Sequence, residues 1–225
     1  LDACGPQELL QFSQALQGRF VPPGPSGSPS RGRCDTLPTG RNFYTVDTRA
    51  IPTQTAWALG QQSAQRVLER YLQEHGEYPQ AIGLSVWGTA TMRTGGDDIA
   101  QAFALIGVRP KWAAGSQRVT DFEVIPAVGL RRPRVDVTLR ISGFFRDAFP
   151  NVVQMFDAAV RAVAELDEDA EDNPIRARVL RDTQAAVDQG LSADAAREQA
   201  LWRVFGAPTG SYGARMHEML RRGQW

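Results

Sequence analysis

The stretch that decides the fold is "AIGLSVWGTATMRTGGDDIAQAFALIG", residues 81–107. Its first seven residues form a nearly continuous apolar run, which is typical of a strand buried on both faces of a sheet. After the pair Gly95–Gly96, we expect Asp97 to cap a helix that Gly107 ends. The apolar stripe of this helix consists of Ile99, Ala102, Phe103 and Ile106. A buried strand followed by an amphipathic helix is a building unit of α/β domains.

Outward from this unit, the same periodicities predict further elements. Alternating apolar residues indicate strands at 41–46 ("RNFYTV") and 134–142 ("RVDVTLRIS"), with shorter candidates in "VRPKWA" and "RVTDFEVIPA". Helical spacing predicts helices at 5–17, after a cap at Thr53, from 151 onward, at 174–189 and at 192–204, with Ser192 as the last cap. The buried face of the helix after Thr53 is expected to present Trp57, Gly60, Ala64, Val67 or Leu68, and Tyr71.

The order of these elements predicts the fold class. Strands that alternate with helices, followed by helices alone, indicate an α/β, Rossmann-like fold with a mostly parallel sheet and flanking helices. We divide the chain into a helix and Pro/Gly-rich loop (1–40), an α/β core (41–150) and a helical C-terminal extension (151–225).

The bulk composition excludes several classes of protein. The 225 residues contain 25 basic and 25 acidic side chains, so nothing indicates a general nucleic-acid or membrane binder. Cys4 and Cys34 form no CxxC pair, which favours a reduced, cytoplasmic compartment. No apolar run approaches the roughly 18 residues of a membrane span, and no signal peptide is evident. Because the chain opens at Leu1 without methionine, we expect a piece of a longer protein.

Three loops that follow predicted strands are rich in polar side chains. Ligands collect at the carboxyl ends of strands in α/β sheets. The first loop contains Asp47 and Arg49, the second Thr89 and Arg93, and the third Arg146 and Asp147 among three phenylalanines at 144, 145 and 149. If the strands are parallel, the three loops line one crevice with arginines, carboxylates and rings, which suits a large, flat, acidic ligand.

Each of these patterns also has a structural explanation. Arg146 and Asp147 could form a surface pair, and "TGGDD" is better explained by helix capping than by phosphate binding, since GxGxxG is absent. The single lysine, Lys111, precedes a tryptophan, so there is no Walker A motif. His75 fits a helix C-terminus and His217 a helix surface, and no zinc motif is present. The acidic run "DEDAED" (167–172) is either a solvated loop or a surface for a basic partner.

The segment between Val21 and Gly40 contains five prolines and four glycines. This composition is typical of a linker. The segment also contains Arg31 and Arg33 and runs into Arg41 and the aromatic pair at 43–44, as a loop beside a ligand would. Composition alone leaves both interpretations open.

Several long motifs, in the same order along nearly the whole chain, resemble one known family. They are "FVPPGPSGSPSRGR", "LPTGRNFYTVD", "LSVWGTATMRTGGDDIAQAFALIGVRP", "RPRVDVTLRISGFFRDAFP" and "VAELDE". They are similar to the large subunits of aerobic cobaltochelatase (the CobN family) and, more distantly, to the H subunits of magnesium chelatase. The form "WGTATMRTGGDD" looks like the cobalt branch. The resemblance also favours an ordered, site-adjacent loop for the Pro/Gly segment.

The resemblance implies a function. In this family the large subunit binds the tetrapyrrole and hosts metal insertion, while separate AAA+ partner subunits hydrolyse ATP with Mg²⁺. The cobalt enzyme inserts Co²⁺, as substrate metal, into hydrogenobyrinic acid a,c-diamide in cobalamin biosynthesis. We expect no resident metal site, no nucleic-acid partner, and no activity from the fragment alone.

Positions within the matching motifs are candidates for the site. Metal insertion requires acceptors for the ring N–H protons, for which we select Asp47 and Asp147. The candidate substrate-binding residues are Arg41, Asn42, Trp87, Thr89, Arg93, Phe145 and Arg146. Among them the arginines would bind substrate carboxylates, and Trp87 and Phe145 would contact the ring.

One position departs from the family pattern, and other functions stay open. Arg131 in "LRRPR" replaces an expected glycine, where it would either disturb a tight turn or lie on the surface.

The alternatives to a cobaltochelatase large subunit are a magnesium-chelatase-like H subunit acting on a porphyrin, a non-catalytic tetrapyrrole-binding module, and a nucleotide-binding α/β domain.

Overall fold

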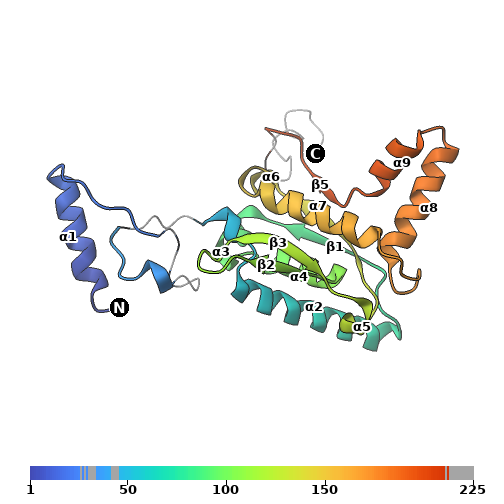
Figure 1. Ribbon diagram of the computed structural model, residues 1–225, viewed down its shortest axis with the longest axis horizontal. Helices are drawn as coiled ribbons and strands as arrows, with labels where there is room; N and C mark the ends of the chain where they lie inside the picture. Colours follow the sequence, from blue (N-terminus) through green and yellow to red (C-terminus); the bar gives the residue numbers. More distant parts are fainter. Residues whose placement is uncertain (26, 28, 30–33, 42–45, 211, 213–225) are drawn as a thin grey trace, which may run out of the picture.

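The computed structural model describes residues 1–25, 27, 29, 34–41, 46–210 and 212. Figure 1 shows an α/β body with an N-terminal part lying to one side of it. The N-terminal part contains α1 (Cys4–Leu16) and the short 3₁₀ helix η2 (Cys34–Thr36). The predicted strand at 41–46 overlaps residues outside this description, and the candidate Asn42 and His217 both lie among those residues.

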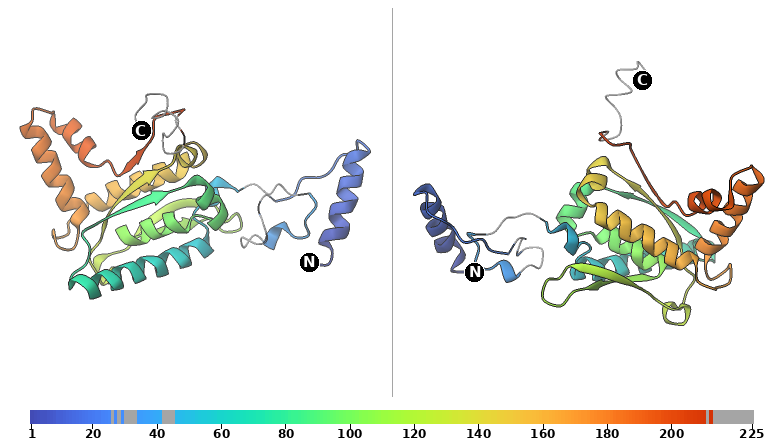
Figure 2. Two further views of the ribbon diagram at one scale, coloured as in Figure 1. Left: turned by 180° about the vertical axis from the view of Figure 1, so that it is seen from behind. Right: turned by 45° about the horizontal axis from the view of Figure 1, so that its top comes forward.

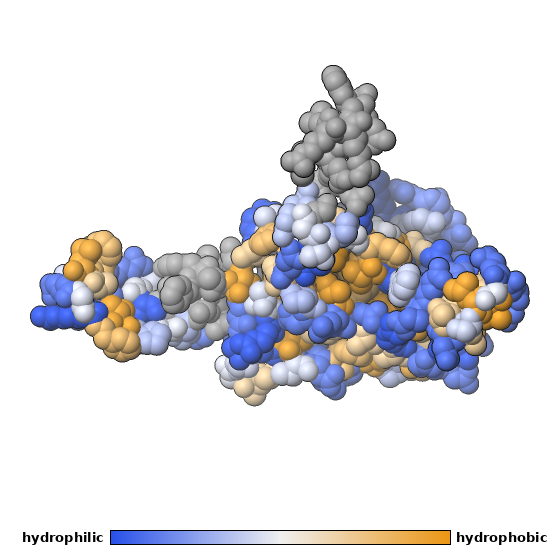
Figure 3. All heavy atoms as spheres, turned by 90° about the horizontal axis from the view of Figure 1, so that it is seen from above, coloured by the Kyte–Doolittle hydropathy of each residue, from blue (hydrophilic) through white to orange (hydrophobic). Residues whose placement is uncertain are grey.

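The N-terminal part is held together by contacts of the segment 24–41 with α1 and within itself. The Thr39 hydroxyl donates a hydrogen bond to Glu8, and the Gly24 amide donates to the Arg41 carbonyl (2.8 Å). The outer side of α1 is apolar: Leu9, Phe12 and Leu16 are 64–74% exposed. Apolar side chains accordingly gather at the far left of Figure 3, where this part lies. These contacts support an ordered segment near 34–40, while residues 30–33 lie outside the description.

The body is built on a parallel sheet, as predicted. In the described residues, β1 (Ala81–Val86), β4 (Asp136–Ile141) and β5 (Val204–Gly206) pair in the order β1-β4-β5, all parallel. The third strand is a correction. Residues 192–204 were predicted to be one helix, but α9 (Ala193–Ala200) ends early and the chain then adds β5 to the sheet.

Three helices supply the core on one side of this sheet. They are α2 (Gln54–His75), α4 (Asp97–Ile106) and α7 (Pro150–Ala164). Val137, Leu139 and Ile141 of β4 point into this core, and every residue of α4 from 102 to 106 is buried. Gly60 of α2 lies so close to α4 that an added Cβ would be 2.5 Å from the Ala100 side chain.

The ends of these helices test the predicted caps. Thr53 Oγ1 accepts from the Ala56 amide (3.1 Å), which confirms the cap of α2. Leu68, rather than Val67, lies on its buried face. The prediction for Asp97 was wrong, because Gly96 is the N-cap of α4 and Asp97 is its first residue.

Shorter elements complete the body. An antiparallel hairpin, β2 (Val108–Trp112) and β3 (Val119–Val124), follows α4. The remaining helices in the described residues are η3 (Thr48–Ala50), α3 (Gly88–Thr94), α5 (Ala127–Leu130), α6 (Gly143–Ala148) and α8 (Pro174–Asp188). No helix in the described part is both long and apolar enough to cross a membrane.

One face of β1 is open, which corrects the expectation of burial on both faces. Val86 is buried and Ile82 and Leu84 are half-buried, but Ala81 and Ser85 are exposed. The sequence of β1 is nearly all apolar because the positions on its open face carry small side chains. In the views of Figures 1 and 2, α8 and α9 lie toward one end of the sheet and α3 and α6 toward the other.

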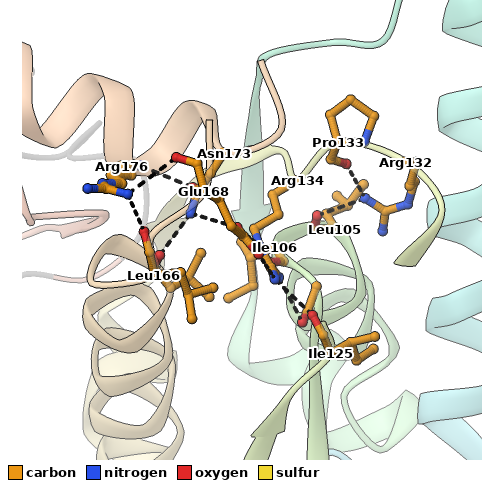
Figure 4. A network of polar contacts seen from close by, with 12 residues as sticks. Leu105, Ile106, Ile125, Arg132, Pro133, Arg134, Leu166, Glu168, Asn173 and Arg176 are labelled. Carbon is orange, nitrogen blue, oxygen red and sulfur yellow. Dashed lines mark hydrogen bonds and ion pairs between the residues drawn. The ribbon is translucent and has the colours of Figure 1, made fainter. Parts of the chain in front are cut away.

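A buried arginine connects three distant segments at the amino end of β4. The Arg134 guanidinium is 1% exposed and donates to both carboxylate oxygens of Glu168 (2.7 and 2.8 Å). It also donates to the carbonyls of Ile106 (3.1 Å), Gly107 (3.2 Å) and Ile125 (2.8 Å), as Figure 4 shows. A Cβ at position 107 would be 2.3 Å from this guanidinium. Glu168 of the acidic run is therefore structural, which the interpretation of a solvated loop missed.

A second buried ion pair attaches β5 to β4. Asp136, 2% exposed, accepts from Arg203 Nε (2.6 Å) and Nη2 (3.1 Å). Arg178 of α8 donates to the same carboxylate (3.0 Å). Arg203 also donates to the Ala200 and Trp202 carbonyls, so the end of α9 is fixed relative to the sheet.

Position 131 gives a first prediction. Arg131 has φ +56° at the C-terminus of α5, the left-handed region that favours glycine. We expect Arg131→Gly to stabilise the chain by about 1 kcal/mol in urea denaturation. Arg131→Ala is the control, since it removes the same side chain but keeps the Cβ. Equal gains from both substitutions would mean that the side chain, and not the backbone, is responsible.

The Arg134–Glu168 pair gives a second prediction. Glu168→Gln leaves a buried guanidinium without its countercharge, so we expect a loss of about 3 kcal/mol in unfolding free energy at neutral pH. Hydrogen bonds from Arg134 lower the pKa of Glu168 below its usual 4.5. The pair therefore stabilises the fold above that value and ceases to do so as the pH falls through the lowered pKa.

Denaturation at several pH values tests this. The difference between wild type and Glu168→Gln should narrow as the pH falls below about 4.5. Glu171→Gln, an exposed position in the same acidic run, serves as the control and should change stability by less than about 0.5 kcal/mol. A difference between Glu168→Gln and wild type that stays constant with pH would contradict the role assigned to the ion pair.

Candidate functional site

The carboxyl ends of the three parallel strands border an open groove. Its volume is about 540 Å³, and its lining includes Ser85, Trp87, Arg140, Ser142, Phe205 and Ala207. The position agrees with the rule that ligands of α/β sheets bind beyond the carboxyl ends of the strands. None of the described residues that line the groove is acidic.

The floor of the groove is a row of side chains across the open face of the sheet. Arg140 of β4 is paired in register with Ser85 of β1 on one side and with Phe205 of β5 on the other. Registered neighbours in a parallel sheet point to the same face. Trp87, two residues after Ser85 and still in extended backbone, comes next along that face. Trp87 and Phe205 are 51% and 50% exposed, so two aromatic rings are available to a flat ligand.

The second and third predicted loops meet at this edge. The Gly88 amide at the start of α3 donates to Ser142 Oγ (3.2 Å), and the same hydroxyl accepts from the Phe145 amide (3.1 Å) as the cap of α6. One serine therefore fixes the starts of both helices. Thr89 and Arg93 of α3 are exposed at this end of the body.

The predicted ring contact Phe145 is not available to a ligand. Phe145 is 0% exposed and packs against Phe149, with ring centroids 5.2 Å apart. Its neighbour Phe144 is 40% exposed instead. The cap at Ser142 sets the phase of α6, so the sequence pattern identified the correct helix but the wrong face.

Arg146 and Asp147 form hydrogen bonds with the segment after β5. Arg146 donates to Asp147 (2.7 and 3.0 Å) and to the carbonyls of Ala207 (2.5 Å) and Pro208 (2.7 Å). The Tyr212 hydroxyl donates to Asp147 Oδ2 (2.7 Å). Hydrogen bonds from Arg146 and Tyr212 lower the pKa of Asp147. Asp147 is thus a weaker proton acceptor than an ordinary carboxylate, and Arg146 already has protein partners.

Asp47 is also paired. It caps η3 by accepting from the Arg49 amide (3.1 Å), and Arg118 Nε donates to it (2.8 Å). Partial burial raises the pKa of Asp47, but hydrogen bonds from Arg118 and the Arg49 amide outweigh burial and leave the pKa below its usual value. Arg41 is exposed, its carbonyl accepts from the Gly24 amide, and it is not among the residues that line the groove.

The first loop still lies beside the other two. Asn151, at the start of α7, donates to the Thr48 carbonyl (3.1 Å), and the Thr53 amide donates to the Gly95 carbonyl (3.0 Å). The three predicted loops thus lie at one end of the body, although ion pairs occupy Asp47 and Asp147.

Asp98 is a carboxyl that the sequence analysis treated only as part of a cap. Burial, with a contribution from the charge of Asp97, raises its pKa to about 6. The direction of this shift is opposite to that of Asp47 and Asp147, whose pKa values are lowered. Among the described residues, no group of three or more His, Cys, Asp or Glu side chains could hold a metal ion.

Arg140 and Phe205 were not among the predicted site residues. Arg140 looked like an ordinary polar residue of an alternating strand, and Phe205 belongs to the strand that was predicted as helix. The alternation at 134–142 did place Arg140 opposite the core, which was the available signal.

Comparison with known proteins identifies the family. The model of the CobN/Magnesium Chelatase family matches residues 1–225. The chain is 63% identical over its full length to the aerobic cobaltochelatase subunit CobN of Pseudomonas aeruginosa, covering 18% of that protein. Over 97% of its length it is 38% identical to the chloroplastic magnesium-chelatase subunit ChlH of Oryza sativa subsp. japonica, covering 15% of that protein.

A solved structure agrees. The catalytic subunit of cobaltochelatase from Mycobacterium tuberculosis superposes with a TM-score of 0.74 at 51% identity, covering 97% of this chain and 18% of that one. The chain therefore spans less than a fifth of the length of these relatives. From its sequence and its fold, the chain belongs to the CobN/magnesium chelatase family.

Proposed function

We propose that this chain forms one wall of the tetrapyrrole site of a cobaltochelatase large subunit. The whole protein would insert Co²⁺ into hydrogenobyrinic acid a,c-diamide, with ATP hydrolysed by AAA+ partner subunits that use Mg²⁺. The observation that supports the site most directly is the groove at the strand ends, where Trp87 and Phe205 expose their rings on either side of Arg140.

The cobalt branch is favoured over the magnesium branch. Identity to the Pseudomonas CobN is 63%, against 38% for the rice magnesium-chelatase subunit, over nearly the same residues. Since those names describe the relatives, the choice of cobalt and of a corrinoid for this chain is part of the proposal.

The chemical roles follow from the geometry. Exposed aromatic rings provide a surface on which a flat macrocycle can stack. The ring nitrogens lose protons as the metal enters, so an acceptor is required. Asp47 and Asp147 would have to leave their present ion pairs to act in this way.

Binding to the full-length polypeptide that contains this chain tests the site. We expect Trp87→Ala to weaken binding of hydrogenobyrinic acid a,c-diamide by roughly tenfold, since loss of aromatic stacking and burial costs on the order of 1.4 kcal/mol. A spectroscopic titration gives the two dissociation constants. Trp202→Ala is the control, because Trp202 is equally exposed (50%) but lines a neighbouring cavity instead of the groove.

The outcomes separate the alternatives. Equal affinities for wild type and Trp87→Ala would remove the groove from the site. Binding of protoporphyrin in preference to the corrinoid would favour a magnesium-chelatase-like function. Tight corrinoid binding without Co²⁺ insertion, in the presence of the ATPase partners, would support a non-catalytic binding module.

A further inference from the structure

Arg140 differs from the other arginines around the groove in its surroundings. Along β4 the side chains alternate, with Val137, Leu139 and Ile141 in the core and Asp136, Thr138 and Arg140 on the opposite face. On that face, exposure increases along the strand: Asp136 is buried, Thr138 half-buried and Arg140 exposed. The cover provided by the C-terminal helices therefore ends before the guanidinium of Arg140.

Four arginines on or next to the helices and strands around Arg140 already have partners. Arg178 and Arg203 donate to Asp136, Arg181 to Asp182 and Arg146 to Asp147. The Arg140 side chain, unlike its backbone, has no hydrogen-bond or ion-pair partner among the residues that the structure describes. It lines the groove, where none of the described lining residues is acidic. Its positive charge is thus available to a ligand.

The surroundings of Arg140 suit an anion attached to a flat ring. Its register partner Phe205 offers an aromatic face, and Trp87 offers a second one at the end of β1. The other register partner, Ser85, is small and leaves space above the sheet. A macrocycle stacked on the rings would exclude water from the guanidinium, which strengthens a charge-assisted contact to a carboxylate.

We propose that Arg140 is a specificity-determining residue that distinguishes a peripheral carboxylate of the macrocycle from the corresponding carboxamide. This inference rests on the proposed function. A guanidinium has five N–H donors and no acceptor, so it binds both oxygens of a carboxylate. A carboxamide has only one oxygen, and its NH₂ group would face the N–H donors of Arg140. Arg140 therefore selects a ring that still carries a carboxylate at this position.

Paired titrations test this selection. The full-length polypeptide is titrated with hydrogenobyrinic acid a,c-diamide and with its fully amidated derivative, and the ratio of the two dissociation constants is measured. We expect wild type to prefer the carboxylated ring by roughly tenfold or more. Arg140→Gln should weaken binding of that ring by roughly tenfold or more while changing binding of the amidated ring less than about threefold. Arg140→Lys should retain part of the preference.

Arg181→Gln is the matched control. Arg181 lines the adjoining cavity of about 450 Å³, which shares Thr138 and Phe205 with the groove, and it is paired with Asp182. We expect this variant to keep the wild-type ratio. Circular dichroism of each variant shows whether the fold is retained.

Each outcome decides between the two proposals. An unchanged ratio in folded Arg140→Gln would overturn the role of Arg140 and leave the tetrapyrrole site standing. This holds also when both dissociation constants rise by the same factor, since Arg140 would then support the groove without distinguishing the two substituents. Failure of wild type to bind either ring would contradict the proposed function itself.

Discussion

The fold depends on the buried Arg134 guanidinium. A charge at 1% exposure is tolerated only when it is paired and its donors are satisfied, and here Glu168 and three carbonyls provide this. Those partners come from the segment after α7, from the end of α4 and from the end of β3 (Figure 4). The arginine can therefore be buried only when all three segments are in their folded positions. Gly107 is needed because a side chain at that position would overlap the guanidinium.

The second buried pair links this framework to the groove. Asp136 lies two residues after Arg134, and its partner Arg203 lies two residues before Phe205. Fixing Arg203 on Asp136 sets the register of β5, and that register places Phe205 beside Arg140. Both anchors are at the amino end of β4, whereas the groove is at the carboxyl end. The residues that stabilise the sheet are thus separated from those that a ligand would contact, so the open end can vary its polar residues without weakening the buried pairs.

Much of the fold could be predicted because its elements have strong periodicity. The strand at 136–141 and the helices at 54–75, 97–106 and 150–164 each repeat apolar residues over enough positions to be recognised, and the strand at 81–86 was recognised by its nearly continuous apolar run. The strand β5 could not, since three residues show no period and its place depends on the Asp136–Arg203 contact. The site residues were harder to predict because they, too, depend on contacts between distant segments. Whether Arg140 or Arg146 is available depends on which carboxylates and carbonyls the fold places beside them, and sequence spacing does not contain that information.

The open face of β1 explains how so small a chain could contribute to a large site. Ala81, Gly83 and Ser85 keep the surface beside Arg140 low and nearly flat, and an added Cβ at Gly83 would meet nothing within 4 Å. The groove is open, so on the proposed function a tetrapyrrole held there could extend across this face. Its opposite side would then contact parts of the longer polypeptide that the relatives possess. Binding one face of the ring in this way suits metal insertion. The chain would contact that face and one carboxylate of the ring, while the other face stays accessible to the metal.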